Sequence, residues 1–391
     1  MKFISSFTNK DLSGEICLLR VDFNLDYNEA AAIKIKDKKT WPLRLSRSLP
    51  TIKFLLNRGA KILILSHRGD PIKKIKNPAS KLILSPNEKK EFSLKFAADF
   101  LSKVSGKETI FFDDFNFKRI KKNIDKAPAK SVFLLENLRF LDKEEKNDKQ
   151  LSNQLASLGT FYVNDAFGAI HRNHCSIAAL AKRFRQNAYM GILIEEEIKN
   201  LSRVAKNQKK PFVVILGGAK VSDKIGVIKN FASKADYFLV GGGIANTLFK
   251  LNGLPIGDSL CDKNTDFKIL APKLRRKIIL PEDTIIYKRQ ILDIGPKTAK
   301  KYAEIIKKAK TIIWNGPMGM IEDKRFSKGS EAIVKAIFKS RAFAVIGGGE
   351  TIALLKTKNY KLKTNIFIST GGGAMLKYLA AEKLPGLKAL S

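Results

Sequence analysis

Glycine clusters follow four apolar runs in the second half of the chain, and such clusters can bind phosphate. Each run continues into a helical pattern, at Leu216–Lys220, Val240–Gly243, Ile346–Thr351 and Thr370–Gly373. Glycine lets backbone N–H groups turn toward a ligand, and the start of a helix adds a partial positive charge. One such turn is also an ordinary connection between a strand and a helix. Four at one expected sheet edge indicate a nucleotide site, although the P-loop, dinucleotide and protein-kinase patterns are absent.

A different set of side chains follows the apolar runs of the first half. Arginine, histidine and acidic residues gather at Arg20–Asn24, Ser66–Pro71, Glu136–Phe140 and Asn164–His174, which together hold all three histidines. A guanidinium binds phosphate through two hydrogen bonds, so this set suits a small phosphorylated anion. Each motif alone could be a surface ion pair or a polar group in the core. Their shared position after strands favours a binding site.

Composition restricts the class of protein. The 391 residues include 44% hydrophobic and 28% charged residues, which is typical of globular proteins and excludes collagen, coiled coils and disulfide scaffolds. Three scattered cysteines, Cys17, Cys175 and Cys261, form no C-x-x-C pair and fit reduced thiols in the cytoplasm. No long apolar run or signal peptide is present, so we expect a soluble cytoplasmic protein without membrane association.

The net charge has two interpretations. With 73 Lys and Arg against 37 Asp and Glu, the chain carries +36, which could attract polyanionic substrates or nucleic acid. No zinc finger, RNP motif or basic zipper accompanies the lysines, and they are scattered along the chain. We therefore do not expect nucleic-acid binding as the main role.

Short apolar runs alternate with helical patterns along the whole chain. Continuous Val, Ile and Leu runs such as Ile16–Val21, Lys61–Ser66 and Phe212–Leu216 predict parallel strands covered on both faces. The fold class is therefore α/β, with two Rossmann-like three-layer domains of mostly parallel sheets joined by a hinge helix. The expected divisions are an N-terminal domain over 1–185, a linker helix over 186–205, a C-terminal domain over 206–375 and a tail over 376–391.

These motifs, in this order, resemble those of the phosphoglycerate kinase family over nearly the whole chain. The resemblance lies in Arg20–Asn24, Leu49–Ile52, Glu136–Phe140, Asn164–His174, Leu216–Ile225, Val240–Asn246, Trp314–Gly319 and Ser369–Ala374. It implies reversible phosphoryl transfer between ATP and 3-phosphoglycerate, giving ADP and 1,3-bisphosphoglycerate, with magnesium and a domain closure that permits in-line transfer. It also implies a monomer, with the tail returning to the 3-phosphoglycerate-binding N-terminal domain.

The resemblance assigns roles residue by residue. The substrate-binding residues would be Asp22, Phe23, Asn24, Arg44, His67, Arg68, Gly69, Asp70, Arg139 and Arg172. The nucleotide-binding residues would be Gly218, Ala219, Lys220, Lys224, Asn315, Glu322, Gly348, Gly349, Glu350 and Thr351, with Glu350 also at the metal. Arg44, Lys220, Gly372 and Gly373 would stabilise the phosphoryl group in transfer. A substrate carboxylate is ionised at neutral pH, so this chemistry needs no general base.

Three positions depart from the family pattern, and the segment between Asn24 and Arg44 is several residues longer than usual. The family usually reads His-Leu-Gly-Arg-Pro where this chain has His67-Arg68-Gly69-Asp70-Pro71, so an acid replaces an arginine that grips the substrate. Arg68 could supply the missing cation. Glu350 stands where the family has aspartate, with the same charge, and we expect it to keep metal binding.

The loss of the arginine at position 70 leaves a second interpretation open. A relative without catalytic activity could use the +36 charge to bind nucleotide or nucleic acid. The intact Lys220, Lys224, Arg139 and Arg172 favour the enzyme, because a chain without catalysis would not need both halves of the site.

Overall fold

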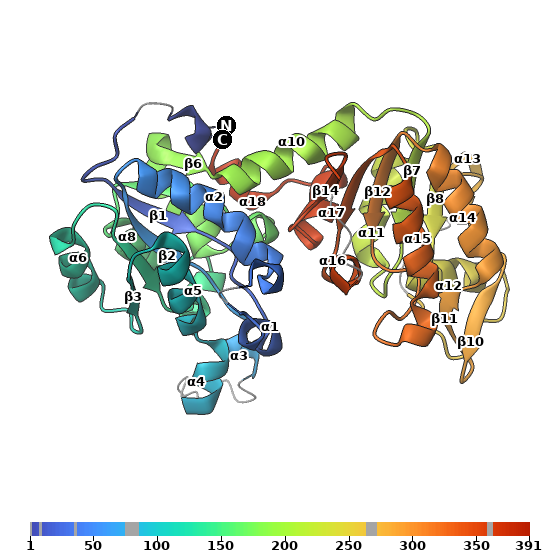
Figure 1. Cartoon of the computed structure of the whole chain (residues 1–391), viewed down its shortest axis with the longest axis horizontal. Helices are drawn as coiled ribbons and strands as arrows, with labels where there is room; N and C mark the ends of the chain where they lie inside the picture. Colours follow the sequence, from blue (N-terminus) through green and yellow to red (C-terminus); the bar gives the residue numbers. More distant parts are fainter. Residues whose placement is uncertain (1, 8–9, 35–36, 75–85, 263–271, 358–362) are drawn as a thin grey trace. The chain divides into compact units, whose positions relative to one another are not determined.

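The structure, a computed structural model, describes residues 2–7, 10–34, 37–74, 86–262, 272–357 and 363–391. The chain forms two compact units (Figure 1). Unit 1 consists of Met1–Glu196 and Lys383–Ser391, and unit 2 consists of Glu197–Glu382. No described helix combines the length and the apolar character that crossing a membrane requires.

Unit 1 is built on a six-stranded sheet in the order β3-β4-β2-β1-β5-β6, and all its neighbouring strands pair in parallel. The strands are β1 (Ile16–Arg20), β2 (Lys61–Leu65), β3 (Thr109–Phe112), β4 (Val132–Leu135), β5 (Phe161–Asn164) and β6 (Ala188–Met190). β1, β2, β4 and β5 are buried at every position, as expected for strands covered on both faces.

Helices cover both faces of this sheet. The helices of unit 1 include α1 (Tyr27–Ala31), α2 (Leu43–Asn57), α3 (Pro71–Lys74), α4 (Pro86–Phe92), α5 (Lys95–Ser105), α6 (Phe117–Lys126), α7 (Asp142–Glu145), α8 (Lys149–Ala156), α9 (Leu180–Phe184) and the first part of α10 (Ile192–Lys206). Apolar side chains of α2 and α5 pack on β1 and β2 in one core cluster, which includes Leu45, Leu55 and Phe100.

The last residues of the chain belong to unit 1. Helix α18 (Pro385–Ala389) lies beside the π-helical turn Cys175–Ala179, and the Gly386 N–H donates to the Ile170 carbonyl at 2.9 Å (Figure 1). A Cβ at position 386 would stand 2.6 Å from an Ile170 side-chain carbon, so only glycine fits this contact.

Unit 2 repeats the architecture with a second six-stranded sheet, ordered β14-β13-β12-β7-β8-β9 and parallel throughout. Its strands are β7 (Phe212–Leu216), β8 (Tyr237–Val240), β9 (Ile278–Ile279), β12 (Thr311–Asn315), β13 (Phe343–Gly347) and β14 (Ile366–Ile368). A separate antiparallel hairpin consists of β10 (Thr284–Tyr287) and β11 (Gln290–Ile294).

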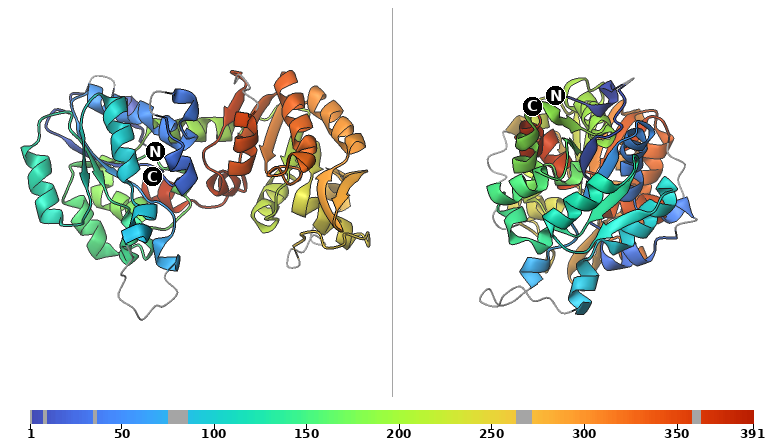
Figure 2. Two further views of the ribbon diagram at one scale, coloured as in Figure 1. Left: turned by 60° about the horizontal axis from the view of Figure 1, so that its bottom comes forward. Right: turned by 90° about the vertical axis from the view of Figure 1, so that its left-hand side faces the viewer.

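The helices of unit 2 also lie on both faces of its sheet (Figure 2). The helices of unit 2 are α11 (Ser222–Phe231), α12 (Gly242–Leu251), α13 (Pro272–Arg275), α14 (Pro296–Lys308), α15 (Lys328–Lys339), α16 (Gly349–Thr357) and α17 (Gly373–Leu379), together with the second part of α10. Because β12 and β13 are parallel neighbours, the helices that lead into them, α14 and α15, run in the same direction.

The predicted α/β class with two mostly parallel sheets is confirmed. The sequence did not predict β3, β6, β9 or the β10–β11 hairpin. β9 has only two residues and β6 three, which is too short for a pattern. The hairpin turns at Lys288 and Arg289 with φ of 45° and 63°, a conformation for which Asn-Gly is the usual signal.

Candidate active site

In unit 1, the position where an open α/β sheet binds its ligand lies beyond the carboxyl ends of β1 and β5. The chain leaves β1 toward β2 on one side and leaves β5 toward β6 on the other. Right-handed crossovers in opposite directions place the following helices on opposite faces of the sheet. Ligands of open α/β sheets bind at such a switch point, so the residues after β1, β2, β4 and β5 are the candidates.

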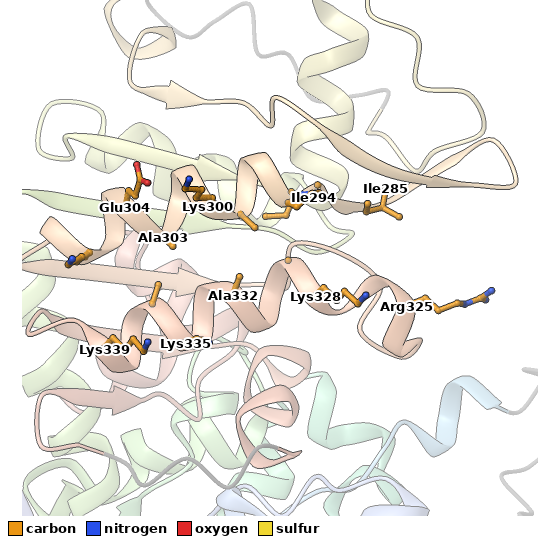
Figure 3. A pocket seen from close by; sticks show the side chains of 16 residues that line it. Ile285, Ile294, Lys300, Ala303, Glu304, Arg325, Lys328, Ala332, Lys335 and Lys339 are labelled. Atoms are coloured by element: carbon orange, nitrogen blue, oxygen red, sulfur yellow. The ribbon is translucent and has the colours of Figure 1, made fainter.

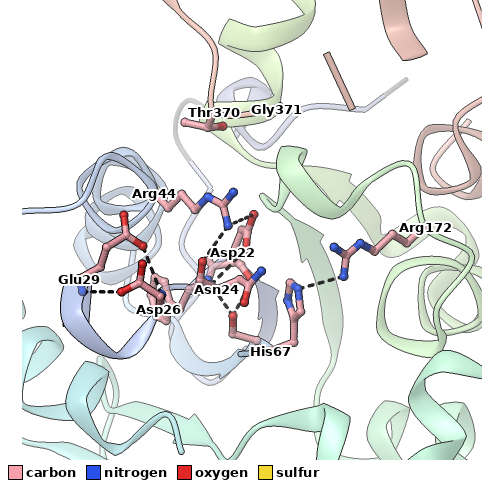
Figure 4. Close-up of polar contacts among 12 residues, drawn as sticks. Asp22, Asn24, Asp26, Glu29, Arg44, His67, Arg172, Thr370 and Gly371 are labelled. Carbon is pink, nitrogen blue, oxygen red and sulfur yellow. Dashed lines mark hydrogen bonds and ion pairs between the residues drawn. The ribbon is translucent and has the colours of Figure 1, made fainter. Parts of the chain in front are cut away.

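His67 lies at this edge with a guanidinium at each ring nitrogen. Arg20 Nη2 is 3.1 Å from Nδ1. Arg172 Nη1 is 3.2 Å from Nε2 (Figure 4). Burial, followed by the positive charges of Arg20 and Arg139, holds the pKa of His67 well below its ordinary value, so the ring is neutral. A neutral imidazole has one lone pair and can accept from only one guanidinium.

The burial of Arg20 decides from which guanidinium His67 accepts a hydrogen bond. Arg20 is 1% exposed, and its Nε donates to Ser176 Oγ at 2.8 Å. Ser176 Oγ in turn donates to the buried Glu144 carboxylate at 2.6 Å. Because a fully buried donor must be satisfied, we assign the Nδ1 lone pair to Arg20 and the hydrogen to Nε2. The half-buried Arg172 then faces a ring N–H and keeps its donor for an anion.

Arg44 and Asn24 form the next part of the edge (Figure 4). Arg44, in the first turn of α2, donates from Nη1 to the Asn24 carbonyl at 2.8 Å and lies 3.6 Å from Asp22 Oδ2. The loop is fixed where α1 begins, because the Asp26 carboxylate accepts the Glu29 N–H at 2.7 Å and Glu29 reaches back to the Asp26 N–H. This capping box terminates the loop that carries the polar side chains.

Arg139 enters the site from the turn after β4. Its Nη1 donates to the Gly69 carbonyl at 2.5 Å, and its Nη2 pairs with Glu145 at 2.8 Å. The Gly69 N–H donates to Asn24 Oδ1 at 2.8 Å. Gly69, with φ of 57°, thus links Asn24 to Arg139 across the edge of the sheet.

The structure gives Arg68 surroundings that its sequence position does not show. The guanidinium is buried and donates to three backbone carbonyls, those of Leu25 at 3.0 Å, Ser93 at 2.9 Å and Asp26 at 3.2 Å. Its face lies 4.8 Å from the centre of the Phe96 ring. These contacts direct Arg68 to the loop backbone, while Asp70 is half-buried beside Gly69.

Phe23 is also placed differently from the polar residues around it. Its side chain is fully buried in the core cluster, and its N–H donates to Ser66 Oγ at 2.9 Å. Any contact of Phe23 with a ligand would therefore come from its backbone.

Unit 2 has the equivalent switch point between β12 and β7. The chain leaves β12 toward β13 and leaves β7 toward β8, so these neighbours diverge in the same way. The Gly217 N–H donates to the Asn315 carbonyl at 3.1 Å, and the Gly218 N–H donates to the Pro317 carbonyl at 2.7 Å. A Cβ at Gly217 would stand 2.0 Å from the Pro317 oxygen, so this close approach requires glycine.

Three glycines at this edge face open space. A Cβ built on Gly349, Gly372 or Gly373 would meet no heavy atom within 4 Å. Gly349 and Gly373 are the first residues of α16 and α17, whose first-turn N–H groups have no partner inside the helix. Open space in front of free amides and a helix start suits phosphate oxygens.

Charged side chains surround this open space. Lys220 is exposed, and Lys224 Nζ donates to the Lys220 carbonyl at 2.8 Å. Burial lowers the pKa of Lys224, while the charges of Asp223 and Glu350 raise it. The exposed Glu350 carboxylate lies beside the Gly218 turn, 3.9 Å from where a Cβ of Gly218 would stand.

Asn315 carries an unpaired buried donor at the switch point. Its Nδ2 has no hydrogen-bond partner among the described residues and lies 3.3 Å from where a Cβ of Gly348 would stand. Thr351 Oγ1 accepts the Gly316 N–H at 3.0 Å and fixes the same turn. Glu322 is exposed on the loop after β12. A buried donor without a partner marks a position that a ligand can satisfy.

The turn that ends in Gly371–Gly373 is held by a buried carboxylate. Glu197 Oε1 accepts the Thr370 N–H at 2.6 Å and Thr370 Oγ1 at 2.9 Å, and Oε2 accepts Ser369 Oγ at 2.7 Å. Ser369 Oγ accepts the Gly371 N–H at 3.1 Å.

The sequence analysis did not assign roles to several of these supporting residues. Glu197 and Glu144 are fully buried acids inside helices, and no pattern separates them from their exposed neighbours. Arg20 stood in the quoted motif, but its position beneath His67 depends on how β1 and β2 pair. The one sequence signal for the role of Arg20 was its position at the end of an otherwise apolar strand.

The positions of the carboxylates determine how the site can bind a metal ion. Among the described residues, no three His, Cys, Asp or Glu side chains are grouped to hold a metal ion by themselves. A single carboxylate such as Glu350, beside open space for phosphate, fits Mg²⁺, which proteins usually hold through one or two carboxylates plus substrate phosphates.

Comparison with known proteins shows the family to which the chain belongs. The family model described as phosphoglycerate kinase matches residues 7–382. The chain is 40% identical to the phosphoglycerate kinase of Clostridium botulinum strain Hall, over 99% of this chain and 98% of that protein. It is 39% identical to that of Clostridium kluyveri, over 97% of each.

Solved structures of the family match both units. The phosphoglycerate kinase of Pyrococcus horikoshii has a TM-score of 0.79 at 32% identity and covers 100% of this chain and 98% of its own. That of Coxiella burnetii has a TM-score of 0.77 at 32% identity and covers 98% of each chain. The chain therefore belongs to the phosphoglycerate kinase family, kinases that transfer a phosphoryl group reversibly between ATP and 3-phosphoglycerate.

Proposed function

We propose that the edge of unit 1 binds 3-phosphoglycerate. Arg44, His67, Arg139 and Arg172 hold its phosphate and carboxylate, and Asp22 and Asn24 hold its hydroxyl. The observation that carries this assignment is the neutral His67 between two guanidiniums, because it leaves Arg172 with a donor for an anion. The backbone of Phe23 and Gly69 completes the pocket, and Arg68 positions its loop.

The edge of unit 2 binds the nucleotide. The amides at Gly218, Ala219, Gly348 and Gly349 approach its phosphates, together with the side chain of Thr351. Lys220 and Lys224 neutralise these phosphates, and the unpaired Nδ2 of Asn315 donates to the ligand. Glu322 lies along the nucleotide on the exposed loop after β12.

The transfer reaction needs positioning and charge rather than a proton acceptor. The acceptor carboxylate is ionised at neutral pH, so it can attack the γ-phosphorus directly, in line with the ADP leaving group. Negative charge spread over the moving phosphoryl oxygens is stabilised by Lys220, Arg44 and the amides of Gly372 and Gly373. Because the two sites belong to different units, turnover requires the units to bring them together.

Magnesium is the cation that this site fits. Glu350 would hold it together with the nucleotide phosphates, and bound Mg²⁺ would neutralise phosphate charge. The replacement of aspartate by glutamate keeps this charge at the start of α16.

We infer a monomer that acts in the cytoplasm without nucleic acid, and its three free thiols fit a reducing compartment.

Coupled turnover and separate binding measurements test the assignments together. Arg172→Ala should weaken 3-phosphoglycerate binding at least tenfold and leave ADP binding unchanged. Lys220→Ala should lower kcat by about 10²–10³, as loss of an electrostatic contact to a transition state does, while both ligands still bind. Lys229→Ala, an exposed lysine on α11, is the matched control and should change neither. If Arg172→Ala weakens ADP instead, the two edges are assigned in the wrong order.

A further inference from the structure

A groove between α14 and α15 lies outside the site residues discussed so far. It has a volume of about 920 Å³ and runs along the two helices, from Ile285 and Arg325 at one end to Glu304 and Lys339 at the other (Figure 3). None of the residues that line it was assigned to the 3-phosphoglycerate site or the nucleotide site.

Small residues make the floor of this groove. Gly295, which caps the start of α14, and Ala299 and Ala303 within it are spaced four residues apart, as are Ala332 and Ala336 on α15. Residues four apart share one helix face, so each helix presents a smooth apolar stripe. The two parallel stripes leave a shallow, unfilled channel into which a third helix could pack its ridge of side chains.

Positive side chains make both rims of the groove. Six basic residues and one acid, Glu304, line it, whereas basic residues outnumber acids about two to one in the whole chain. The basic residues are Lys300, Lys307, Arg325, Lys328, Lys335 and Lys339. Arg325 already pairs with Asp323 at 2.6 Å, so the lysines supply the unneutralised charge.

We propose that this groove binds an acidic amphipathic helix of a partner protein. The groove lies along helices of 13 and 12 residues, each about 20 Å long at 1.5 Å per residue, which accommodates roughly four turns of a third helix. An apolar stripe would lie on the alanines, and acidic residues on either side would face the lysines. This is the helix-in-groove mode of recognition.

The observations favour this occupant over others. A second copy of the chain carries +36 and would be repelled by the rims. The carboxylate of a fatty acid needs a cation at one end, whereas lysines border this groove along its whole length. Among the described residues that line it, none is an aromatic that could stack nucleic-acid bases.

The test uses a fluorescent amphipathic peptide of about 14 residues, with leucine and alanine on one face and glutamate on both flanks. A peptide of the same composition in scrambled order, which has no stripe, is the first comparison. Fluorescence anisotropy with the full-length wild-type protein should give micromolar binding for the striped peptide, at least tenfold weaker binding for the scrambled one, and weaker binding as salt rises. Equal binding of both peptides would mean charge attraction alone and would overturn the proposal.

Charge reversal on the rims locates the binding. Lys307→Glu/Lys335→Glu should weaken the striped peptide at least tenfold, whereas Lys308→Glu/Lys229→Glu, two exposed lysines outside the groove, should change binding less than twofold. Kinase turnover, unchanged in both double variants, shows that each is folded. An equal loss of peptide binding in both double variants would overturn the proposal. Displacement of the labelled peptide by duplex DNA or oleate, but not by excess unlabelled striped peptide, would also overturn it.

Discussion

Glu197 and Thr370 lie 173 positions apart in the chain, and one carboxylate oxygen of Glu197 accepts both the backbone N–H of Thr370, at 2.6 Å, and its hydroxyl, at 2.9 Å. The pair joins α10 to the turn after β14, where Gly371–Gly373 follow. The position of these amides therefore depends on the Glu197 side chain.

Replacement of Glu197 by alanine should lower both stability and turnover. Removing the carboxylate leaves the buried Thr370 N–H unpaired, which costs about 1–3 kcal/mol in the free energy of unfolding. The loosened Gly371–Gly373 turn should lower kcat more than it raises the KM for ATP. Urea unfolding and steady-state kinetics measure the two effects, with Glu195→Ala on the same helix as control. Normal kcat in a destabilised protein would limit Glu197 to a structural role.

Gly373→Ala should separate activity from stability. The new methyl group meets no protein atom within 4 Å, and Gly373 begins α17, where alanine favours the helix by up to about 1 kcal/mol. The same methyl group would occupy space that the transferring phosphoryl needs, so we expect kcat to fall by at least about tenfold. Thermal unfolding and turnover measure both. Unchanged kcat would remove Gly373 from the phosphoryl site.

Arg68→Leu introduces the residue usual in the family and tests what Arg68 does here. If the guanidinium supports the loop, its loss leaves the buried carbonyl of Leu25 and the partly buried carbonyl of Ser93 without a donor and should destabilise the protein by about 3 kcal/mol. The KM for 3-phosphoglycerate should then rise only a few-fold. A large rise in KM with unchanged stability would show instead that Arg68 replaces the arginine missing at position 70.

Asp165 makes stability depend on pH. Burial raises the pKa of this fully buried carboxyl to about 7, whereas in the unfolded chain it is near 3.8. A raised folded pKa means that the folded state keeps its proton, so this contribution is full below pH ~4, falls as pH rises, and is lost above pH ~7. Relative to Asp165→Asn, the wild type should lose about 1.4 kcal/mol per pH unit across that window. A difference independent of pH in urea titrations would contradict the shift.

Salt should weaken substrate capture without slowing the chemistry. The net charge of +36 attracts anionic substrates, and the screening length falls from about 30 Å at 0.01 M salt to about 10 Å at 0.1 M. We expect the KM values for ATP and 3-phosphoglycerate to rise several-fold over this range while kcat changes little. KM values that do not respond to salt would exclude steering by the surface charge.

Much of the fold could be predicted from the sequence because buried parallel strands appear in it as continuous apolar runs. Phe212–Leu216 was predicted with its observed bounds, and Ile16–Val21 and Lys61–Ser66 to within one residue. Glycines and arginines directly after such runs predict a sheet edge with chemistry. The β10–β11 hairpin gave no such signal, because its turn uses Lys288 and Arg289.

The hydrogen bonds that support the site could not be predicted in the same way. Which of three successive glutamates is buried depends on the rotation of α10 against unit 2, and Glu197 is the buried one. Arg68 read as a substrate cation because charge is visible in a sequence, whereas the three carbonyls that surround it come from residues 25, 26 and 93. Contacts to backbone atoms leave no trace in residue types.

The return of α18 to unit 1 has a consequence for how the chain folds as it is synthesised. Unit 2 is one continuous stretch, so it can fold as soon as Glu382 has left the ribosome. Unit 1 begins first but is completed last, because the contact of Gly386 with Ile170 awaits residues 383–391. A chain that lacks that segment would carry a complete unit 2 and an incomplete unit 1, so limited proteolysis should cut unit 1 first.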